Sequence, residues 1–378
     1  MRKKIMTMLC VVAAMIIYAA VLVHAEDVET LAGVGSHGAE DGEAAQFNLP
    51  LGVAVGPGGE IMVADTFNSL IRSVDENGVV TTLTLHVPLH DAWGFPLGGH
   101  ADAALGDALF NRPTGIAAGF HGWIFVADSH NHAVRVVVGD RVYTLAGGDE
   151  EGFADGSRQA ARFSYPSAIA VSPSGYLYVA DTGNHAIRRI DLSGNVTTVA
   201  GTPGVHGYNN GSQNVALFDS PMGLAFCDIG RLFIADTGNH VIRVLYDGEV
   251  RTFAGSRMVL PDAYFGEWED APAGGFADGA AASARFNRPM GLSAWGDVLF
   301  VADSGNHAIR AVTFDEDVLT LAGTGYPGNM DGSLAVASFY LPSGIYVFGD
   351  VLLVADTGNS MVRAIDLFAA LDLVESLR

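Results

Sequence analysis

Cysteine and lysine are nearly absent, and both shortages limit what this chain can do. The 378 residues include two cysteines, Cys10 and Cys227, and the only lysines are Lys3 and Lys4. Cys10 lies in an N-terminal apolar segment that we expect to be removed. The mature chain would then hold one cysteine and could form no internal disulfide, although an oxidising compartment would permit one. Its stability must therefore come from packing.

Positive charge is scarce along the whole chain. Without the basic residues 2–4, 17 arginines stand against 42 acidic side chains, which gives a formal charge of −25. Nucleic-acid affinity rests mainly on cationic side chains that neutralise phosphates, and anionic membranes attract the same charge. We therefore expect no nucleic-acid partner.

Residues 1–25 are organised as a secretory signal peptide. The basic residues 2–4 precede an uncharged apolar run of 19 residues, 5–23, and Val23-His24-Ala25 offers a small-residue cleavage site. The alternative is an uncleaved signal anchor, because such a run is nearly long enough to span a bilayer. Both interpretations export the rest of the chain, as a secreted, extracellular or lumenal protein. A membrane is a partner only if residues 5–23 stay attached.

The most informative feature is a stretch that occurs six times. Residues 179–190 read Val-Ala-Asp-Thr-Gly-Asn-His-Ala-Ile-Arg-Arg-Ile, and in every copy Asn follows Asp by three residues and Arg follows it by seven. Successive Asp residues are 63, 53, 55, 67 and 53 positions apart, a period typical of repeat architectures. The copies are Asp65, Asp128, Asp181, Asp236, Asp303 and Asp356, with Arg72, Arg135, Arg188, Arg243, Arg310 and Arg363.

Each repeat contains four short segments typical of β-strands. In the third copy they are 169–171, 176–180, 186–190 and 196–200, which are rich in apolar, aromatic or β-branched residues and bounded by Gly and Pro turns. Six repeats of four antiparallel strands predict an all-β fold, a six-bladed β-propeller over residues 26–365.

The fourth segment of the repeat shows how the ring would close. It occurs once before the first Asp motif, and no copy follows the last one. We therefore predict that the N-terminal strand completes the last blade, which removes open sheet edges. Apolar residues at helical spacing predict a short docked helix in the tail, 366–378. The fourth segments are 28–33, 80–85, 142–147, 196–201, 250–255 and 318–323.

The motif Asp-Thr-Gly-Asn-His-Ala-Ile-Arg resembles the NHL repeat, which is named for an Asn-His-Leu core. Asn-His is present in four copies, whereas Asn68-Ser69 and Asn359-Ser360 depart from it. The resemblance covers about nine-tenths of the chain. It implies a six-bladed propeller that mostly serves as a binding platform, and it says little about the ligand.

Because Asp, Asn and Arg recur in every blade, we expect them to have a structural role in each blade. Asp and Asn would bond backbone N–H groups of the turn, Gly would supply a positive φ, and Arg would pair with an Asp of its own or a neighbouring blade. In the alternative, the Asp residues are catalytic and the four His residues ligate metal. Symmetric His residues, however, lie too far apart around a ring to share one ion.

A second recurrent piece precedes each first strand, as in residues 152–163. Its Asp-Gly pair and Ala-rich sequence suggest a capped helical turn, with a Phe as the inward anchor. The anchors are Phe47, Phe110, Phe163, Phe218, Phe286 and Phe339.

Departures from the repeat are the better functional candidates. Phe and His replace the motif Gly in the first two blades, and two long connections, 86–100 and 256–275, add aromatic residues near acidic ones. Loops between second and third strands emerge on the same face as the connections between blades, and aromatic rims suit protein or glycan binding. In the alternative, the long loops only pack over the rim. The candidates are Phe67, Trp93, Phe95, His130, Tyr264 and Trp268.

We therefore expect an exported binding platform for a protein, or for a glycan, without catalysis, cofactor or metal. The rival function is a metal-dependent hydrolase or lyase, because lactonases and an amidating lyase with related propellers use metals in the central channel. The segments predicted to line that channel contain no Asp, Glu or His. They are 52–55, 115–118, 168–171, 223–226, 291–294 and 344–347.

Overall fold

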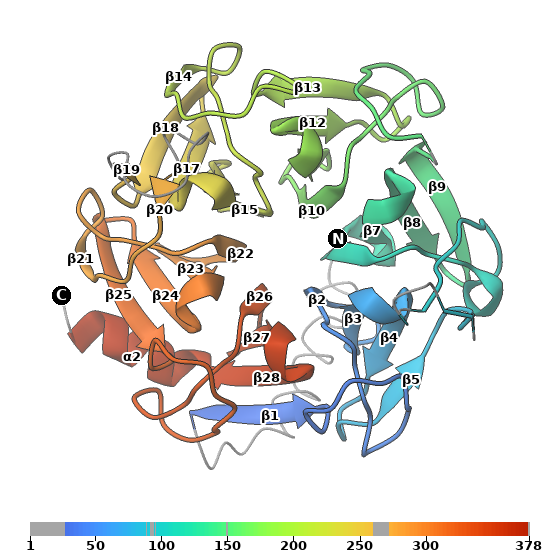
Figure 1. Cartoon of the computed structure of the whole chain (residues 1–378), viewed down its shortest axis with the longest axis horizontal. Coiled ribbons are helices and arrows are strands. Elements are labelled where there is room, and N and C mark those ends of the chain that lie inside the picture. Colours follow the sequence, from blue (N-terminus) through green and yellow to red (C-terminus); the bar gives the residue numbers. More distant parts are fainter. Residues whose placement is uncertain are drawn as a thin grey trace, which may run out of the picture.

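Six β-sheets stand around a central axis in the computed structural model, as the blades of a propeller (Figure 1). The predicted all-β, six-bladed fold is confirmed. The structure describes residues 27–87, 89–90, 94, 96–148, 150–259 and 272–376. The predicted signal peptide at 1–25 and the candidates Trp93, Phe95, Tyr264 and Trp268 lie outside the described residues.

Each of the first three blades is a four-stranded antiparallel meander whose strands follow the chain from the axis outward. The first blade is β2 (Gly52–Val55), β3 (Ile61–Asp65), β4 (Leu70–Val74) and β5 (Val80–Thr82). The second is β6 (Pro113–Ala118), β7 (Ile124–Asp128), β8 (Ala133–Val138) and β9 (Arg141–Gly147). The third is β10 (Pro166–Val171), β11 (Leu177–Asp181), β12 (Ala186–Ile190) and β13 (Val196–Ala200).

The next two blades carry a short fifth strand at their outer edge. The fourth blade is β15 (Gly223–Phe226), β16 (Leu232–Asp236), β17 (Val241–Tyr246) and β18 (Glu249–Ala254), with β14 (Gly211–Ser212). The fifth is β22 (Pro289–Trp295), β23 (Val298–Asp303), β24 (Ala308–Thr313) and β25 (Asp317–Ala322), with β21 (Gly279–Ala280). A separate hairpin pairs β19 (Met258–Val259) with β20 (Pro272–Ala273).

The sixth blade is built from both ends of the propeller sequence. Its inner strands are β26 (Pro342–Phe348), β27 (Val351–Asp356) and β28 (Met361–Asp366), and its outer strand is β1 (Val28–Ala32). β1 runs antiparallel to β28, with Val28 opposite Ile365 and Thr30 opposite Arg363, which confirms the predicted closure (Figure 1).

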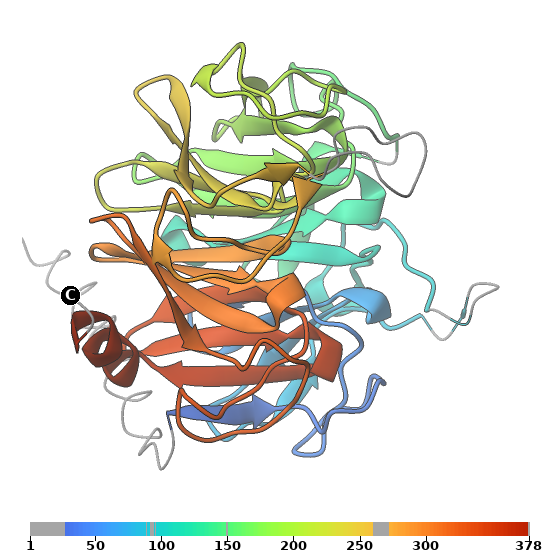
Figure 2. The ribbon, with the colours of Figure 1, turned by 60° about the vertical axis from the view of Figure 1, so that its left-hand side comes forward.

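The helix α2 (Leu367–Ser376) follows β28 directly and lies against the outside of the ring, as Figure 2 shows. Its buried residues Leu367, Ala370 and Val374 pack on the core between the fifth and sixth blades. No helix in the described part of the chain has both the length and the apolar character needed to cross a membrane.

The connection that leads into each blade covers that blade's outer edge. Gly42 bridges to Val80 in the first blade, and Gly156 bridges to Val196 in the third. β14 and β21 are longer versions of the same contact. Each outer strand therefore has a partner on its free side, which limits edge-to-edge association.

The first strands approach one another closely at the centre. A Cβ atom on Gly52 would lie 2.1 Å from the carbonyl oxygen of Thr114 in the next blade, and one on Gly223 would lie 1.7 Å from that of Met290. Only glycine fits where backbones meet at this distance. The inner ring is therefore packed tightly enough to define a narrow central cavity.

Candidate functional site

The repeated Asp, Asn and Arg form one buried unit in each blade. In the first blade, Oδ2 of Asp65 accepts hydrogen bonds from Nδ2 of Asn68 and Nη1 of Arg72, both at 2.8 Å. Its Oδ1 accepts the backbone N–H of Asn48 at 2.7 Å. Asp65 and Arg72 are fully buried, and the same ion pair recurs within each of the other blades. The carboxylate thus ties the third strand to the segment that precedes the first strand.

A second carboxylate, which the sequence analysis missed, completes this unit. Nη2 of Arg72 donates to Oδ1 of Asp41 at 2.6 Å, and Asp41 accepts the N–H of Thr82 in the fourth strand at 3.1 Å. Equivalent acceptors lie 31 to 33 residues before each Arg. They are Asp41, Asp102, Asp155, Asn210, Asp278 and Asp331.

These acceptors correct the interpretation of the Asp-Gly segment. Residues 152–163 form turns and two β-bridges and contain no helix, and the side chain of Asp155 binds Arg188 and Thr198 instead of capping a helix. The predicted Phe anchors are buried, and each guanidinium lies over such a ring, as Arg188 does 5.0 Å from the centroid of Phe163. The segment therefore serves to surround the arginine.

The pKa values of the two kinds of carboxyl are shifted in opposite directions, because the inner one is fully buried and the outer one only in part. Loss of solvent raises the pKa of Asp65, Asp236, Asp303 and Asp356 to about 6, against the lowering effect of the hydrogen bonds and the arginine charge. Partial burial also acts on Asp41, but hydrogen bonds from Thr82 and Arg72 outweigh it and lower the pKa. Both kinds of Asp are engaged by arginine, which fits a structural role.

The His residues of the repeat join neighbouring blades. Nδ1 of His185 accepts the backbone N–H of Ser220 in the next blade at 3.0 Å, and His132 accepts that of Tyr165 at 3.2 Å. His240 and His307 make the same contact. Where the repeat has Ser, its Oγ takes over this bond, as Ser69 does for the N–H of Arg112 at 3.2 Å. An acceptor at this position is therefore what all six copies share.

The turn geometry differs from the prediction at the motif glycine. The left-handed residue is the one after Asn, with φ of 54° at His185, whereas Gly183 does not have a positive φ. Gly183 is favoured by space, because a Cβ there would lie 2.2 Å from the hydroxyl oxygen of Ser164. The turn Asn donates to the Asp carboxylate and to a carbonyl, as Asn184 does to Gly152, and does not accept a turn N–H.

The two departures from this glycine are part of one aromatic and cationic group, which we call the rim cluster: Phe67, Arg112, His130, His132 and Tyr165. The guanidinium of Arg112 lies 5.0 Å from the ring centroid of Phe67. The ring of Tyr165 stands edge-on to His130 at 5.2 Å and to His132 at 4.7 Å. Phe67 and Arg112 are half-buried, and His130 and Tyr165 are exposed. The cluster crosses two blade boundaries, from the first blade to the third.

The charge of this cluster resides on Arg112. Although His130 keeps an exposed surface, partial desolvation, the positive charge of Arg112 and the charge that His132 gains on protonation lower its pKa to about 4. Desolvation also lowers the pKa of His132, against the attraction of Glu151. Both imidazoles are therefore neutral at physiological pH.

The long insertion after the fourth blade ends on the same face as the rim cluster. β20 contacts the 3-10 turn η6 (Thr237–Asn239), which joins the second and third strands of the fourth blade. The aromatic residues predicted within this insertion and within 86–100 are outside the described residues, so a role for Trp93, Phe95, Tyr264 and Trp268 stays a prediction.

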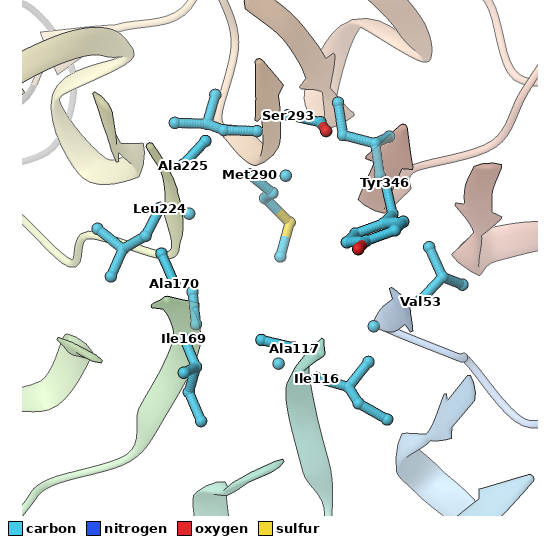
Figure 3. Close-up of a pocket in the computed structure, with 18 of the residues that line it drawn as sticks. Val53, Ile116, Ala117, Ile169, Ala170, Leu224, Ala225, Met290, Ser293 and Tyr346 are labelled. Atoms are coloured by element: carbon cyan, nitrogen blue, oxygen red, sulfur yellow. The ribbon is translucent and has the colours of Figure 1, made fainter. Parts of the chain in front are cut away.

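A cavity of about 330 Å³ lies on the propeller axis, lined by the first strands of all six blades (Figure 3). Its wall consists of aliphatic and small side chains, two methionines, the rings of Phe226 and Tyr346, and the hydroxyls of Ser and Thr. Asp, Glu, His, Lys and Arg are all missing from the described wall. The wall therefore offers no ionisable acid or base near neutral pH.

The fold and the repeated Asp-Asn-Arg unit define a six-bladed β-propeller of the NHL type. The family model of the teneurin NHL domain matches residues 31–245. The chain therefore belongs to the NHL-repeat family, as its sequence motif predicted.

Curated relatives and solved structures agree with this class. The chain is 34% identical over 284 residues to Protein SUPPRESSOR OF QUENCHING 1, chloroplastic, of Arabidopsis thaliana. This alignment covers 71% of this chain and 26% of the relative. It is 30% identical over 345 residues to NHL repeat-containing protein 2 of Bos taurus, and that alignment covers 81% of this chain and 45% of the relative. The chain thus spans less than half the length of either relative.

A solved protein of unknown function from Bacteroides thetaiotaomicron shares the fold, with a TM-score of 0.65 at 17% identity. The superposition covers 90% of this chain and 76% of that one. At this identity the likeness concerns the fold alone.

Proposed function

We propose that the chain is an exported binding platform whose partner is a protein that contacts the rim cluster. The observation that carries this proposal is the joining of Phe67, Arg112, His130 and Tyr165 across two blade boundaries. Phe67 and His130 come from turns that depart from the repeat, so ring assembly alone does not account for these two side chains.

The chemistry of the cluster suits a protein surface. Tyr, Trp and Arg are the side chains that most often dominate binding energy at interfaces, because they bury a large area and keep a polar end. Tyr165 exposes 39% of its surface and packs between the rings of His130 and His132, so little rotational freedom remains to be lost on binding. The described cluster is thus a preorganised anchor.

A binding role also agrees with the central cavity. Hydrolase or lyase chemistry in a propeller channel would require ligating or proton-transferring side chains from several blades. The described channel wall presents only apolar side chains and neutral hydroxyls at that place. This wall composition favours the platform over the metal-dependent enzyme.

The proposal predicts that truncation of the rim cluster removes partner binding without loss of fold. The full chain, the Phe67→Ala/His130→Ala variant and a control variant would be used as baits in extracts of the native compartment. We expect the rim variant to lose proteins that the wild type retains, by at least about tenfold in recovered amount. Its melting temperature should stay within a few degrees of the wild type.

The matched control lies in the turn between the first and second strands of the second blade, on the opposite face. Phe120 is 56% exposed, and His121 has a left-handed φ of 62°. The control is therefore Phe120→Ala with His121→Asn, since Asn tolerates that backbone conformation. Equal recovery of the same proteins by all three baits would contradict the assignment of the rim cluster.

A further inference from the structure

We propose that the central cavity binds a small, uncharged molecule with an apolar body and a hydrogen-bonding group for the hydroxyl of Tyr346. This site is distinct from the rim cluster, and the inference does not rest on the proposed function. It follows from the composition of the wall, its asymmetry and the state of its hydroxyl groups.

The wall contains a complete apolar ring. Strand register places one aliphatic residue of each first strand opposite the residue two positions before the repeated Asp. All six side chains belong to the cavity wall and provide apolar surface for a ligand. They are Val53, Ile116, Ile169, Leu224, Leu292 and Ile345.

The next position along each first strand breaks the sixfold symmetry. Five blades have a small residue there, and the sixth blade has Tyr346, which Figure 3 shows reaching into the cavity. Packing between blades does not require a large residue at this level, because the other blades close with small ones. The small residues are Ala54, Ala117, Ala170, Ala225 and Ser293.

The hydroxyl of Tyr346 is a side-chain polar group of the wall that a ligand can use, beside the backbone groups on the inner edges of the first strands. Among the described residues we find no hydrogen-bond partner for it, whereas Ser293 already accepts the N–H of Val347 at 3.0 Å. The other three hydroxyls of the wall, those of Thr114, Ser167 and Ser343, donate to carbonyl groups of neighbouring blades. Burial raises the pKa of Tyr346, so its hydroxyl stays protonated and can donate.

Charge excludes most other ligand classes. A charged ligand in the cavity loses hydration and finds no charged side chain of opposite sign in the described wall. An anion is further disfavoured by the net charge of −22 on the whole chain. The cavity volume of about 330 Å³ falls in the range of sites that enclose small molecules. A neutral, compact ligand with an apolar body and a hydrogen-bonding group is what remains.

The test compares three probes of one size with the full chain: naphthalene-2-methanol, naphthalene and 2-naphthoate. Isothermal titration calorimetry at pH 7 should give saturable binding of the alcohol with a stoichiometry near one. We expect the alcohol to bind about fivefold more tightly than naphthalene, because of one hydrogen bond. The carboxylate should bind at least about tenfold more weakly than the alcohol. Absence of saturable binding of the alcohol, or equal binding of the carboxylate, would overturn the inference.

Two variants locate the site. Tyr346→Phe should weaken the alcohol about fivefold and leave naphthalene unchanged, whereas Tyr326→Phe, whose side chain is 77% exposed, should change neither. Ala117→Leu adds bulk at a wall position equivalent to that of Tyr346 and should reduce binding of both probes by at least about tenfold, with the fold checked by circular dichroism. Unaltered binding by a folded Ala117→Leu variant would place the probes elsewhere and refute the assignment.

Discussion

At the scale of single residues, the buried ion pair is what distinguishes this propeller from a purely apolar ring. Two buried charges lose hydration, and their attraction offsets that loss only when further hydrogen bonds satisfy the remaining donors and acceptors. Asp181 meets this condition through Arg188, Asn184 and the N–H of Ser164. The pair therefore specifies where the turn, the third strand and the preceding segment meet.

This arrangement predicts an asymmetry between single and double substitutions. Arg188→Met should lower the free energy of unfolding by about 3–5 kcal/mol, because it leaves a buried carboxylate without its counter-charge. Arg188→Met with Asp181→Leu should recover a large part of this loss, since no buried charge remains. Urea denaturation of both variants and the wild type measures the difference. A double variant as unstable as the single one would show that the hydrogen bonds of Asp181, and not its charge, dominate.

The predictability of such residues from sequence depends on repetition. The Asp and Arg of the buried pair could be predicted because six copies agree in spacing. The outer carboxylate escaped detection because its distance to Arg varies, Asn210 replaces Asp in the fourth blade, and Asp102 lacks the following Gly. The sequence around Tyr346 is that of an ordinary strand. Only alignment of the six first strands shows that Tyr346 is a large residue where the other blades have Ala or Ser. Contacts between blades, such as the one made by His185, depend on tertiary packing that strand patterns do not encode.

At the scale of elements, the turns after the second strands bind each blade to the next. The residue after Asn accepts a backbone N–H through an imidazole or hydroxyl, and the residue after Asp adds a second bond, as Thr182 donates to the carbonyl of Pro221 at 2.7 Å. The turns therefore serve for assembly of the ring as well as reversal of the chain. They also introduce a dependence on pH.

Protonation of the turn histidines should weaken the contacts between blades. Desolvation lowers the pKa of His132, His185 and His307 in the folded state below the ordinary value of 6.5. Their contribution to stability is thus fully present above pH 6.5 and is lost as pH falls through the folded pKa, because a protonated Nδ1 cannot accept. The raised pKa of Asp65 and its equivalents has the opposite effect, because it increases the stability of the folded state as the pH falls from about 6 to 4. The pH dependence of wild-type stability therefore does not isolate the effect of the histidines.

A variant with Ser in place of all three histidines isolates the effect of the imidazoles. Ser is the residue that the first and sixth blades have at this turn position. The free energy of unfolding would be measured from pH 7.5 to 5.0 by urea denaturation. At pH 7.5 the variant should stay within about 1 kcal/mol per site of the wild type, since Ser also accepts the N–H. On acidification it should lose less stability than the wild type. Parallel pH profiles would contradict the role assigned to the imidazoles.

At the scale of the whole molecule, closure decides whether six blades behave as one unit. In open repeat arrays each unit contacts only its neighbours and ends can unfold separately. Here β1 supplies the outer strand of the sixth blade, and Val28 is fully buried in the core between the fifth and sixth blades. The first and last residues of the ring are thus held in one sheet, and the hydrogen bond of Thr357 to the carbonyl of Pro50 joins the sixth blade to the first.

Removal of β1 should therefore affect the entire ring and not the sixth blade alone. Deletion of residues 28–33 exposes the edge of β28, removes Val28 from the core and removes the hydrogen bonds that Thr30 donates to Asp331. We expect the wild type to melt in one cooperative transition, and the deletion variant to melt at least about 10 °C lower, with early exchange of amide hydrogens in β26–β28. A synthetic peptide of residues 27–35, added in excess, should raise this melting temperature by mass action, whereas a peptide with Val28 replaced by Asp should not. A deletion variant that melts like the wild type would show that the contacts between blades hold the ring without the shared sheet.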